Sequence, residues 1–146
     1  MAKAAGATHG INYKTENFVD RVKEITDGNG VDVVYDSIGQ DTYPASLDCL
    51  KPLGLFVTFG NASGPIKNFD VGILGGKGSL YVTRPTLFTY TAKRADLLAN
   101  AADLFEVVES GAVSIKVNQT YPLSEAAQAH RDLESRATTG STVFIP

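Results

Sequence analysis

Apolar and polar residues alternate along the chain in blocks that predict helices joined to strands. Phe18, Val22 and Ile25 recur at helical spacing, and either Asn17 or Thr15 can cap a helix over these positions. The segment "DGNG" follows, and its turn-forming residues are expected to end the helix. This pattern predicts one amphipathic helix before the first long apolar run.

The segment "VDVVYD" at residues 31–36 is that run, and its almost continuous apolar character is typical of a buried parallel strand. A second helix is expected after it, with Asp41 as the cap and with Tyr43, Leu47 and Leu50 on one face. The stretch "KPLG" is expected to end this helix, because proline and glycine interrupt helices.

The same alternation continues toward both ends of the chain. The first six residues are typical of the last turn of a helix that stops at Gly6, and residues 11–13 predict a short strand. The longest helix is expected at residues 91–110, with a buried stripe formed by Leu98, Ala101, Phe105 and Val108. The remaining expected elements are strands at 55–59, 78–85, 114–123 and 141–146, and a Ser-capped helix at 124–135.

Strands that alternate with helices in this way predict an α/β fold with a doubly wound parallel sheet. Ligands bind such sheets at the carboxyl ends of the strands, which here are residues 13–14, 36–39, 59–63 and 84–87. A dinucleotide-binding sheet normally carries G-x-G-x-x-G after its first strand, and no stretch of this sequence matches that pattern. We therefore expect an incomplete Rossmann-type sheet that lacks its first strand–helix unit, followed by a strand–helix–strand tail.

Composition narrows the possible functions. A net charge of −3 without a basic cluster argues against a surface for nucleic acids or anionic membranes. No apolar run is long enough for a transmembrane helix, and the cytoplasm is the expected compartment. Cys49 is the only cysteine, and the two histidines, His9 and His130, are far apart in the sequence. Neither a disulfide nor a metal site is therefore expected.

Several segments together resemble one known family. "GINYKTENFVDRVKEIT", "GVDVVYDSIGQDT", "SLDCLKPLGLFVTFGNASG", "GSLYVTRPTL" and "AHRDLESRATTGSTVFIP" occur in the order found in the C-terminal half of the quinone oxidoreductases. These are the zeta-crystallin-like, zinc-free branch of the medium-chain dehydrogenase/reductase family. The resemblance implies that NADPH transfers a hydride to a quinone or an activated enone.

The resemblance also implies a domain division. Residues 1–112 correspond to a partial dinucleotide-binding domain, and residues 113–146 to a segment that packs on the catalytic domain in the family. The opening "MAKAAGA" corresponds to the end of the helix that follows the family's glycine-rich phosphate loop. We therefore expect that the catalytic domain and that loop are missing from this chain.

Two residues correspond to the family's site for the 2′-phosphate of NADPH. Tyr13 follows the expected early strand, and Arg136 lies in "ESRATTG" near the C-terminus. A guanidinium makes paired charge-assisted hydrogen bonds to phosphate, and a phenol adds a directed hydroxyl. The alternatives are a strand-end tyrosine and an arginine that interacts with a helix dipole.

The resemblance assigns further cofactor contacts to the expected strand ends. Ser37 corresponds to a position beside the adenine and ribose, although a simple turn serine is an equal alternative. The segment alongside the nicotinamide half comprises Phe59, Gly60, Asn61 and Ala62. The segment whose backbone reaches the carboxamide comprises Arg84, Pro85, Thr86 and Leu87. The strand Ser79–Thr83 corresponds to a homodimer edge in the family.

No catalytic residue is predicted. Cys49 fits a small core residue, and His130 lies on an amphipathic helix without a nearby nucleophile. Asp36 and Asp41 fit strand-end and helix-cap roles better than an acid pair.

Two functions therefore remain open from the sequence. The first is the cofactor-binding, dimer-forming part of an NADPH-dependent quinone oxidoreductase. The second is a non-catalytic fragment that folds or self-associates without productive cofactor binding. An enoyl or alcohol dehydrogenase of the same superfamily is a weaker third interpretation, because "FGNASG" and "YVTRP" resemble the quinone branch.

Overall fold

The computed structural model describes residues 2–146, which form two compact units, residues 2–93 and 94–146. The division falls between Lys93 and Arg94, so the long helix belongs with the C-terminal strands. The domain division that the resemblance implies, between residues 112 and 113, stays a prediction. Each unit is described by itself.

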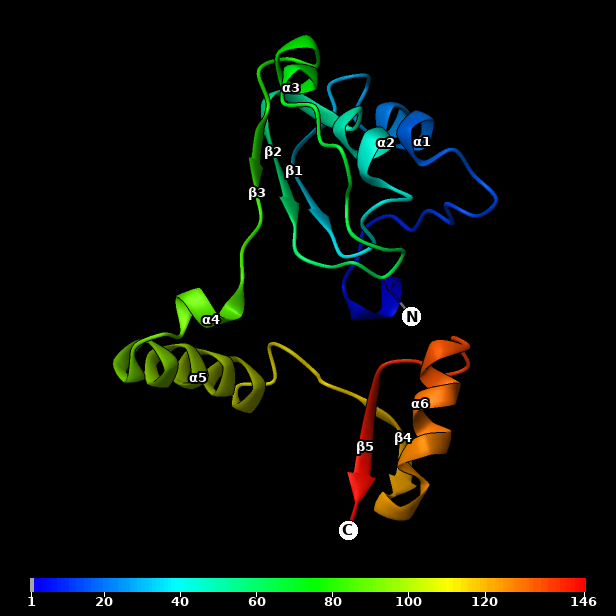
Figure 1. The fold of residues 1–146 in the computed structure, drawn as a ribbon, viewed down its shortest axis with the longest axis vertical. Helices are drawn as coiled ribbons and strands as arrows, with labels where there is room; N and C mark the ends of the chain where they lie inside the picture. Colours follow the sequence, from blue (N-terminus) through cyan, green and yellow to red (C-terminus); the bar gives the residue numbers. More distant parts are fainter. Residues whose placement is uncertain (1) are drawn as a thin grey trace. The chain divides into compact units, whose positions relative to one another are not determined.

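The first unit is built on a parallel sheet of three strands, in the order β1-β2-β3 (Figure 1). The strands are β1 (Val31–Asp36), β2 (Leu50–Thr58) and β3 (Tyr81–Thr83). Val34 of β1 pairs with Phe56 of β2, which in turn pairs with Val82 of β3. The predicted parallel α/β architecture is confirmed.

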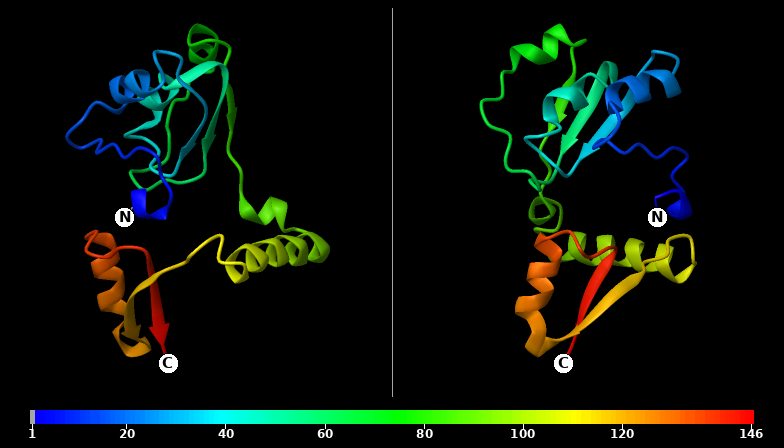
Figure 2. Two further views of the ribbon diagram at one scale, coloured as in Figure 1. Left: turned by 180° about the vertical axis from the view of Figure 1, so that it is seen from behind. Right: turned by 90° about the vertical axis from the view of Figure 1, so that its right-hand side faces the viewer.

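Short helices precede, connect or follow these strands. They are η1 (Lys3–Ala5), α1 (Phe18–Ile25), α2 (Tyr43–Leu47), α3 (Gly72–Gly76) and α4 (Leu87–Tyr90). Of these, α2 and α3 are the two that connect the strands. Asn17 caps α1, because its side chain accepts hydrogen bonds from the backbone N–H groups of Val19 and Asp20. The views in Figure 2 show α1 beside α2. Gly6 follows η1 with a φ of 100°, which agrees with the predicted helix end, although Met1 lies outside the described residues.

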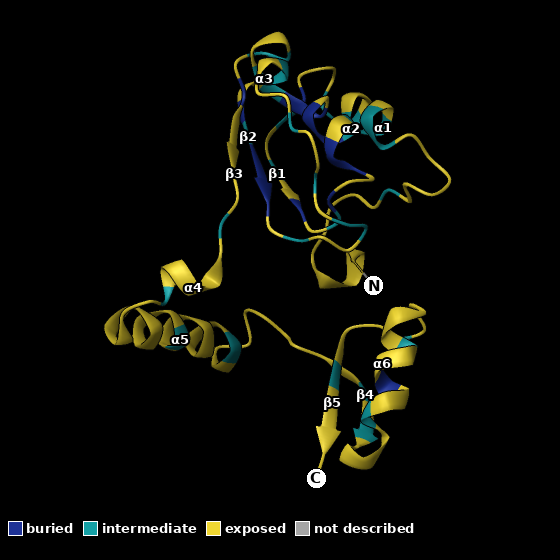
Figure 3. Ribbon diagram, viewed as in Figure 1, coloured by how far each residue is buried: buried dark blue, intermediate teal, exposed yellow. Residues whose placement is uncertain are grey.

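The core of this unit lies on one face of the sheet. Phe56 in the central strand is completely buried, and it packs with Tyr43, Leu47, Leu50 and Leu80. The rings of Tyr43 and Phe56 are 6.3 Å apart. Figure 3 shows the buried positions concentrated on β2 and α2. The core therefore depends on the central strand and the short helix that precedes it.

The opposite face explains why the prediction of a buried strand at residues 31–36 is wrong. Val33 and Tyr35 are exposed, with 73% of Tyr35 accessible, and Tyr81 on β3 is 61% exposed. Within the described residues β1 has a strand partner on only one side. Of this apolar run, Val31 and Val34 pack against the core, whereas Val33 and Tyr35 are exposed to solvent.

Three other local predictions are also wrong. Residues 11–13 form no strand, because Asn12 instead starts a turn in which its side-chain oxygen accepts from Lys14 N. Asp41 does not cap α2, whose N-cap residue is Thr42. The stretch "KPLG" lies inside β2 as a bulge: Val31 pairs with Leu50, but Val33 pairs with Leu55.

The second unit confirms the predicted strand–helix–strand tail. Its elements are α5 (Arg94–Glu109), β4 (Val117–Pro122), η2 (Leu123–Glu125), α6 (Ala126–Glu134) and β5 (Ser141–Ile145). Strands β4 and β5 are parallel, and α6 connects them. The hydroxyl of Tyr121 donates to Asp132 at 2.7 Å, which ties β4 to α6 and raises the pKa of the tyrosine.

Two predictions in this unit are wrong. Leu98 is 52% exposed and Phe105 is 62% exposed, so the predicted stripe of α5 is not buried. The apolar side chains of α5 are only weakly gathered on one side of the helix, and the helix has no buried residue. Ser124 does not cap α6, because it lies within η2 and the N-cap residue is Glu125. Among the described residues, no helix combines the length and apolar character needed to cross a membrane.

The position of the core predicts a sharp difference between two aromatic residues. Replacing Phe56 with Ala should lower the free energy of unfolding by about 3–5 kcal/mol, because the deletion leaves a cavity in the core. Replacing the exposed Tyr35 with Ala should cost less than about 1 kcal/mol. Urea unfolding of both variants tests this, and equal losses would contradict the placement of the core.

Candidate functional site

The loops that follow β1 and β2 are joined by backbone hydrogen bonds. The N–H of Phe59 donates to the carbonyl of Asp36 at 2.9 Å, and Ala62 N donates to Ser37 O at 3.2 Å. Ser63 N then donates to Ile38 O at 2.8 Å. The carboxyl ends of the two strands therefore form one connected platform.

The buried carboxylate of Asp36 fixes the first of these loops. One oxygen accepts from the N–H of Ile38 at 3.0 Å and from the hydroxyl of Thr42 at 2.9 Å. The other accepts from the N–H of Gly39 at 3.0 Å. Asp36 is only 4% exposed, so these three donors replace the water that it loses on burial. Asp36 has the predicted strand-end position, at the last residue of β1.

The two loops approach each other so closely that Gly60 cannot carry a side chain. A Cβ built on Gly60 would lie 2.2 Å from the carbonyl oxygen of Ser37. The resemblance assigns Gly60 to the segment beside the nicotinamide half, whereas the close approach in the structure is to Ser37. Gly60 therefore maintains the platform.

The guanidinium of Arg84, directly after β3, braces the second loop. Its Nη1 donates to the carbonyl of Gly60 at 3.1 Å and to the hydroxyl of Thr58 at 3.3 Å. The side-chain amide of Asn61 has one orientation in which both its nitrogen and its oxygen form hydrogen bonds. In that orientation Nδ2 donates to Gly60 O at 2.9 Å and Oδ1 accepts from Arg84 Nη2 at 3.2 Å. The ends of all three strands are thus linked.

Two cavities lie beside this platform. The first has a volume of about 220 Å³ and is lined by Tyr13 and Phe18 together with the end of β1. The second has a volume of about 310 Å³ and lies over β2 and β3. Its lining residues are Thr58, Asn61, Pro65, Ile66, Phe69, Val82 and Arg84.

The structure brings part of the predicted site together. The platform holds Ser37, Phe59, Gly60, Asn61, Ala62 and Arg84. Tyr13 lines the first cavity along with Asp36 and Ile38. Pro85 and Thr86 continue from β3, and Leu87 begins α4 with 73% of its surface exposed.

The sequence did not predict five residues that line the second cavity: Thr58, Pro65, Ile66, Phe69 and Val82. The position of Thr58 at a strand end was a usable signal, whereas Phe69 lies in a loop with no pattern.

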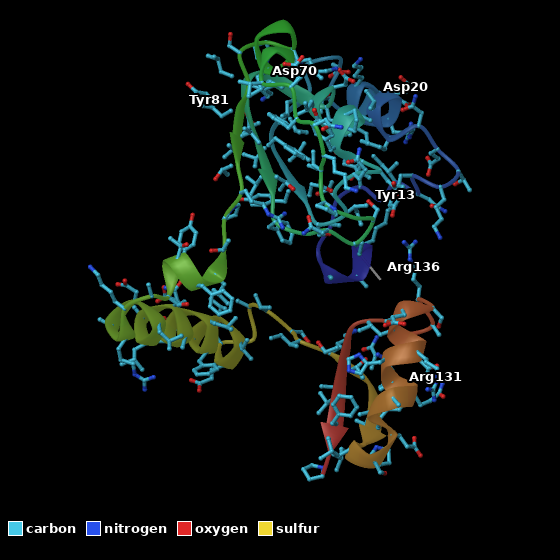
Figure 4. The ribbon with its side chains drawn as sticks, in the orientation of Figure 1. Tyr13, Asp20, Asp70, Tyr81, Arg131 and Arg136 are labelled. Atoms are coloured by element: carbon cyan, nitrogen blue, oxygen red, sulfur yellow. The ribbon has the colours of Figure 1, made fainter. Side chains whose placement is uncertain are left out.

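Arg136 belongs to the second unit and directly follows Ser135, the C-cap residue of α6 (Figure 4). Its φ is +61°, in the left-handed region that glycine usually occupies after a helix. The N–H of Arg136 donates to Leu133 O, and that of Ala137 donates to Asp132 O. Within the described residues, no carboxylate forms an ion pair with Arg136. A strained arginine with an uncompensated charge is a candidate for binding an anion.

Cys49 is buried, which confirms the prediction that it is a small core residue. Burial, together with the nearby Asp48 carboxylate, raises the pKa of the thiol to about 11, despite an opposing effect of Lys23. The thiol is therefore protonated at neutral pH and packs as a small core residue.

Comparison with known families identifies the chain. The sequence profile of the zinc-binding dehydrogenases matches residues 5–144. The chain belongs to the zinc-binding dehydrogenase family.

Individual members of this family are highly similar to the chain. A quinone oxidoreductase of Pseudomonas aeruginosa is 52% identical over 146 residues, which is 100% of this chain and 45% of the relative. A 2-haloacrylate reductase of a Burkholderia species is 47% identical over 99% of the chain and 44% of the relative. The chain thus spans less than half the length of these relatives.

Solved structures of this family share the fold. The Escherichia coli quinone oxidoreductase complexed with NADPH superimposes with a TM-score of 0.95 and 51% identity, over 99% of this chain and 45% of that one. A mycobacterial protein, Rv1454c, also complexed with NADPH, has a TM-score of 0.93 and 42% identity, over 99% of this chain and 46% of that one.

The family's name raises the question of a zinc site. Among residues 2–146, no group of three or more His, Cys, Asp or Glu side chains is placed to hold a metal ion. Cys49 is buried with a raised pKa, and His9 and His130 belong to different units. The side chains of the described residues therefore do not fit a zinc centre.

The close packing of the two loops predicts an unequal response to added methyl groups. Replacing Gly60 with Ala should lower the free energy of unfolding by about 1–3 kcal/mol, because its Cβ would overlap the Ser37 backbone. Gly75 in α3 provides the control, since a Cβ there meets nothing within 4 Å. Thermal unfolding should show Gly75→Ala to be neutral or stabilising, and a neutral Gly60→Ala would contradict the connected platform.

Proposed function

We propose that this chain is the cofactor-binding part of an NADPH-dependent quinone oxidoreductase. The observation that carries the proposal is its likeness to the quinone oxidoreductase complexed with NADPH, at 51% identity and a TM-score of 0.95. The quinone oxidoreductase of Pseudomonas aeruginosa matches the chain from end to end. The acceptor would be a quinone or an activated enone.

The described residues fit the parts of NADPH that they would hold. Tyr13 is 46% exposed and lines the first cavity, where its hydroxyl is available to a phosphate. Arg136 adds a charge without an acidic partner in the described chain. The resemblance assigns each of these two residues to the 2′-phosphate that distinguishes NADPH from NADH.

The remaining contacts would come from the platform. Ser37 would border the adenosine half. The nicotinamide half would lie along Phe59, Gly60, Asn61 and Ala62, and along the backbone of Arg84, Pro85, Thr86 and Leu87. When bound, NADPH would supply the hydride, and the protein would supply binding and orientation. We assign no acid, base or nucleophile in this chain.

We further propose that the family's dimer edge is retained in the strand Ser79–Thr83. In the described part of the chain β3 is an edge strand, and its Tyr81 is 61% exposed (Figure 4). An exposed edge has free backbone donors and acceptors that a second copy can pair with.

Arg136 gives the most direct test of cofactor preference. Replacing it with Gly should weaken NADPH binding about tenfold or more, since a charge-assisted contact is lost, and leave NADH binding unchanged. The same change should raise the free energy of unfolding by about 1 kcal/mol, because glycine relieves the left-handed backbone.

Fluorescence titration and urea unfolding measure these two effects. Arg131, exposed on α6, is the matched control, and Arg131→Ala should leave both affinities unchanged. An equal loss of NADPH and NADH affinity would contradict a phosphate role for Arg136. No binding of either nucleotide by the unmodified chain would favour the alternative of a fragment without productive cofactor binding.

If two copies pair through β3, the fraction of the chain that is dimeric should rise with protein concentration. Replacing Tyr81 with Lys should shift the chain toward the monomer, because a charge at a sheet edge opposes strand pairing. Sedimentation over a range of concentrations measures this, and Tyr35→Lys is the control on the other edge strand. A monomer at every concentration before mutation would rule out the proposed dimer.

A further inference from the structure

The second cavity has a chemical character that NADPH binding does not require. Its walls are largely apolar, formed by Pro65, Ile66, Phe69 and Val82. Arg84 is the one charged residue among those lining it. The volume of about 310 Å³ lies at the lower end of the range for ligand sites, so the cavity suits a small molecule.

The charge of Arg84 is held in place but not neutralised. Its Nη1 and Nη2 contact neutral oxygens, those of Thr58, Gly60 and Asn61. Neither an ion pair from a carboxylate to Arg84 nor a hydrogen bond from its Nε occurs within the described residues. These neutral oxygens therefore fix the orientation of the guanidinium without neutralising its positive charge, which remains available to an anionic ligand.

The geometry of the guanidinium limits what it can bind. An arginine has five N–H donors in a planar fork. Nη2 makes one hydrogen bond and Nε makes none within the described residues, so each of these two neighbouring nitrogens keeps an N–H for a ligand. Two parallel N–H groups on one edge match the two oxygens of a carboxylate. A phosphate would gain less here, because the lining supplies no second cation.

We propose that this cavity, the Arg84 pocket, binds a small apolar carboxylic acid in its ionised form. The carboxylate would pair with Nε and Nη2 of Arg84, and the hydrocarbon part would lie against Phe69, Ile66 and Val82. Thr58 and Asn61 would restrict rotation of the arginine. That such an acid is also a substrate rests on the proposed function, whereas its binding does not.

The test uses trans-2-hexenoate as the acid and trans-2-hexenamide as its uncharged analogue. Each is titrated into the full chain without nucleotide and followed by NMR. The acid should bind at least about tenfold more tightly than the amide, since a hydrogen bond between charged groups is worth about 1.5–3 kcal/mol. Its affinity should fall with added salt. Shifts should centre on the Asn61 side-chain amide and the Phe69 ring.

Two substitutions of Arg84 distinguish the effect of its charge on binding from an effect on folding. Arg84→Met should reduce affinity for the acid about tenfold and remove the difference between acid and amide, whereas Arg84→Lys should retain part of it. Arg94→Met removes an exposed charge from the other unit and should change nothing.

Equal binding of acid and amide by the unmodified chain would overturn the proposal, whether or not the variants fold. Shifts centred away from the pocket would overturn it as well. Failure of NADPH binding would leave these results unaffected, because no nucleotide is present.

Discussion

The buried carboxylate of Asp36 is the constraint on which the rest of the candidate site depends. A carboxylate can remain inside a protein only if donors replace its lost water, and here Ile38, Gly39 and Thr42 provide them. Those donors fix the loop after β1. That loop offers the carbonyls of Ser37 and Ile38 to the loop after β2.

This arrangement makes the loop sequences interdependent. Gly60 has no space for a Cβ because Ser37 is already fixed, and Arg84 can bridge to Gly60 only because that carbonyl is directed toward it. A change at the end of one strand is therefore transmitted to the other two. Parallel strands favour such coupling, because their carboxyl ends meet at the same edge of the sheet.

The parts that could be predicted from the sequence are those with local causes. Asn17 caps α1 through its own side chain, and the tail strands follow from turn residues and apolar runs near them in the sequence. The ends of β1, β2 and β3 were located because a strand end is followed by small or polar residues. Six predicted site residues consequently lie together on the platform.

The wrong predictions have non-local causes. The apolar residues of β1 and α5 can be buried only where another element covers them, and several of them are exposed in the structure. Asp41 and Thr42 are both good caps, and Thr42 occupies the N-cap position while its hydroxyl is held by Asp36, a tertiary contact. Phe69 joins the second cavity through a loop whose path no periodicity reveals.

Two arginines show how the same side chain is prepared for binding in different ways. Arg84 is held by its head group, which donates to neutral oxygens, while its backbone leaves a strand in an ordinary conformation. Arg136 is held by its backbone, in a left-handed turn after α6, while its head group is free of ion pairs in the described chain. A fixed head group favours a ligand of defined shape, such as a planar carboxylate. A head group without such fixing contacts can turn toward a phosphate, whose oxygens accept hydrogen bonds from several directions. The structural difference between the two arginines therefore supports assigning them to different ligands.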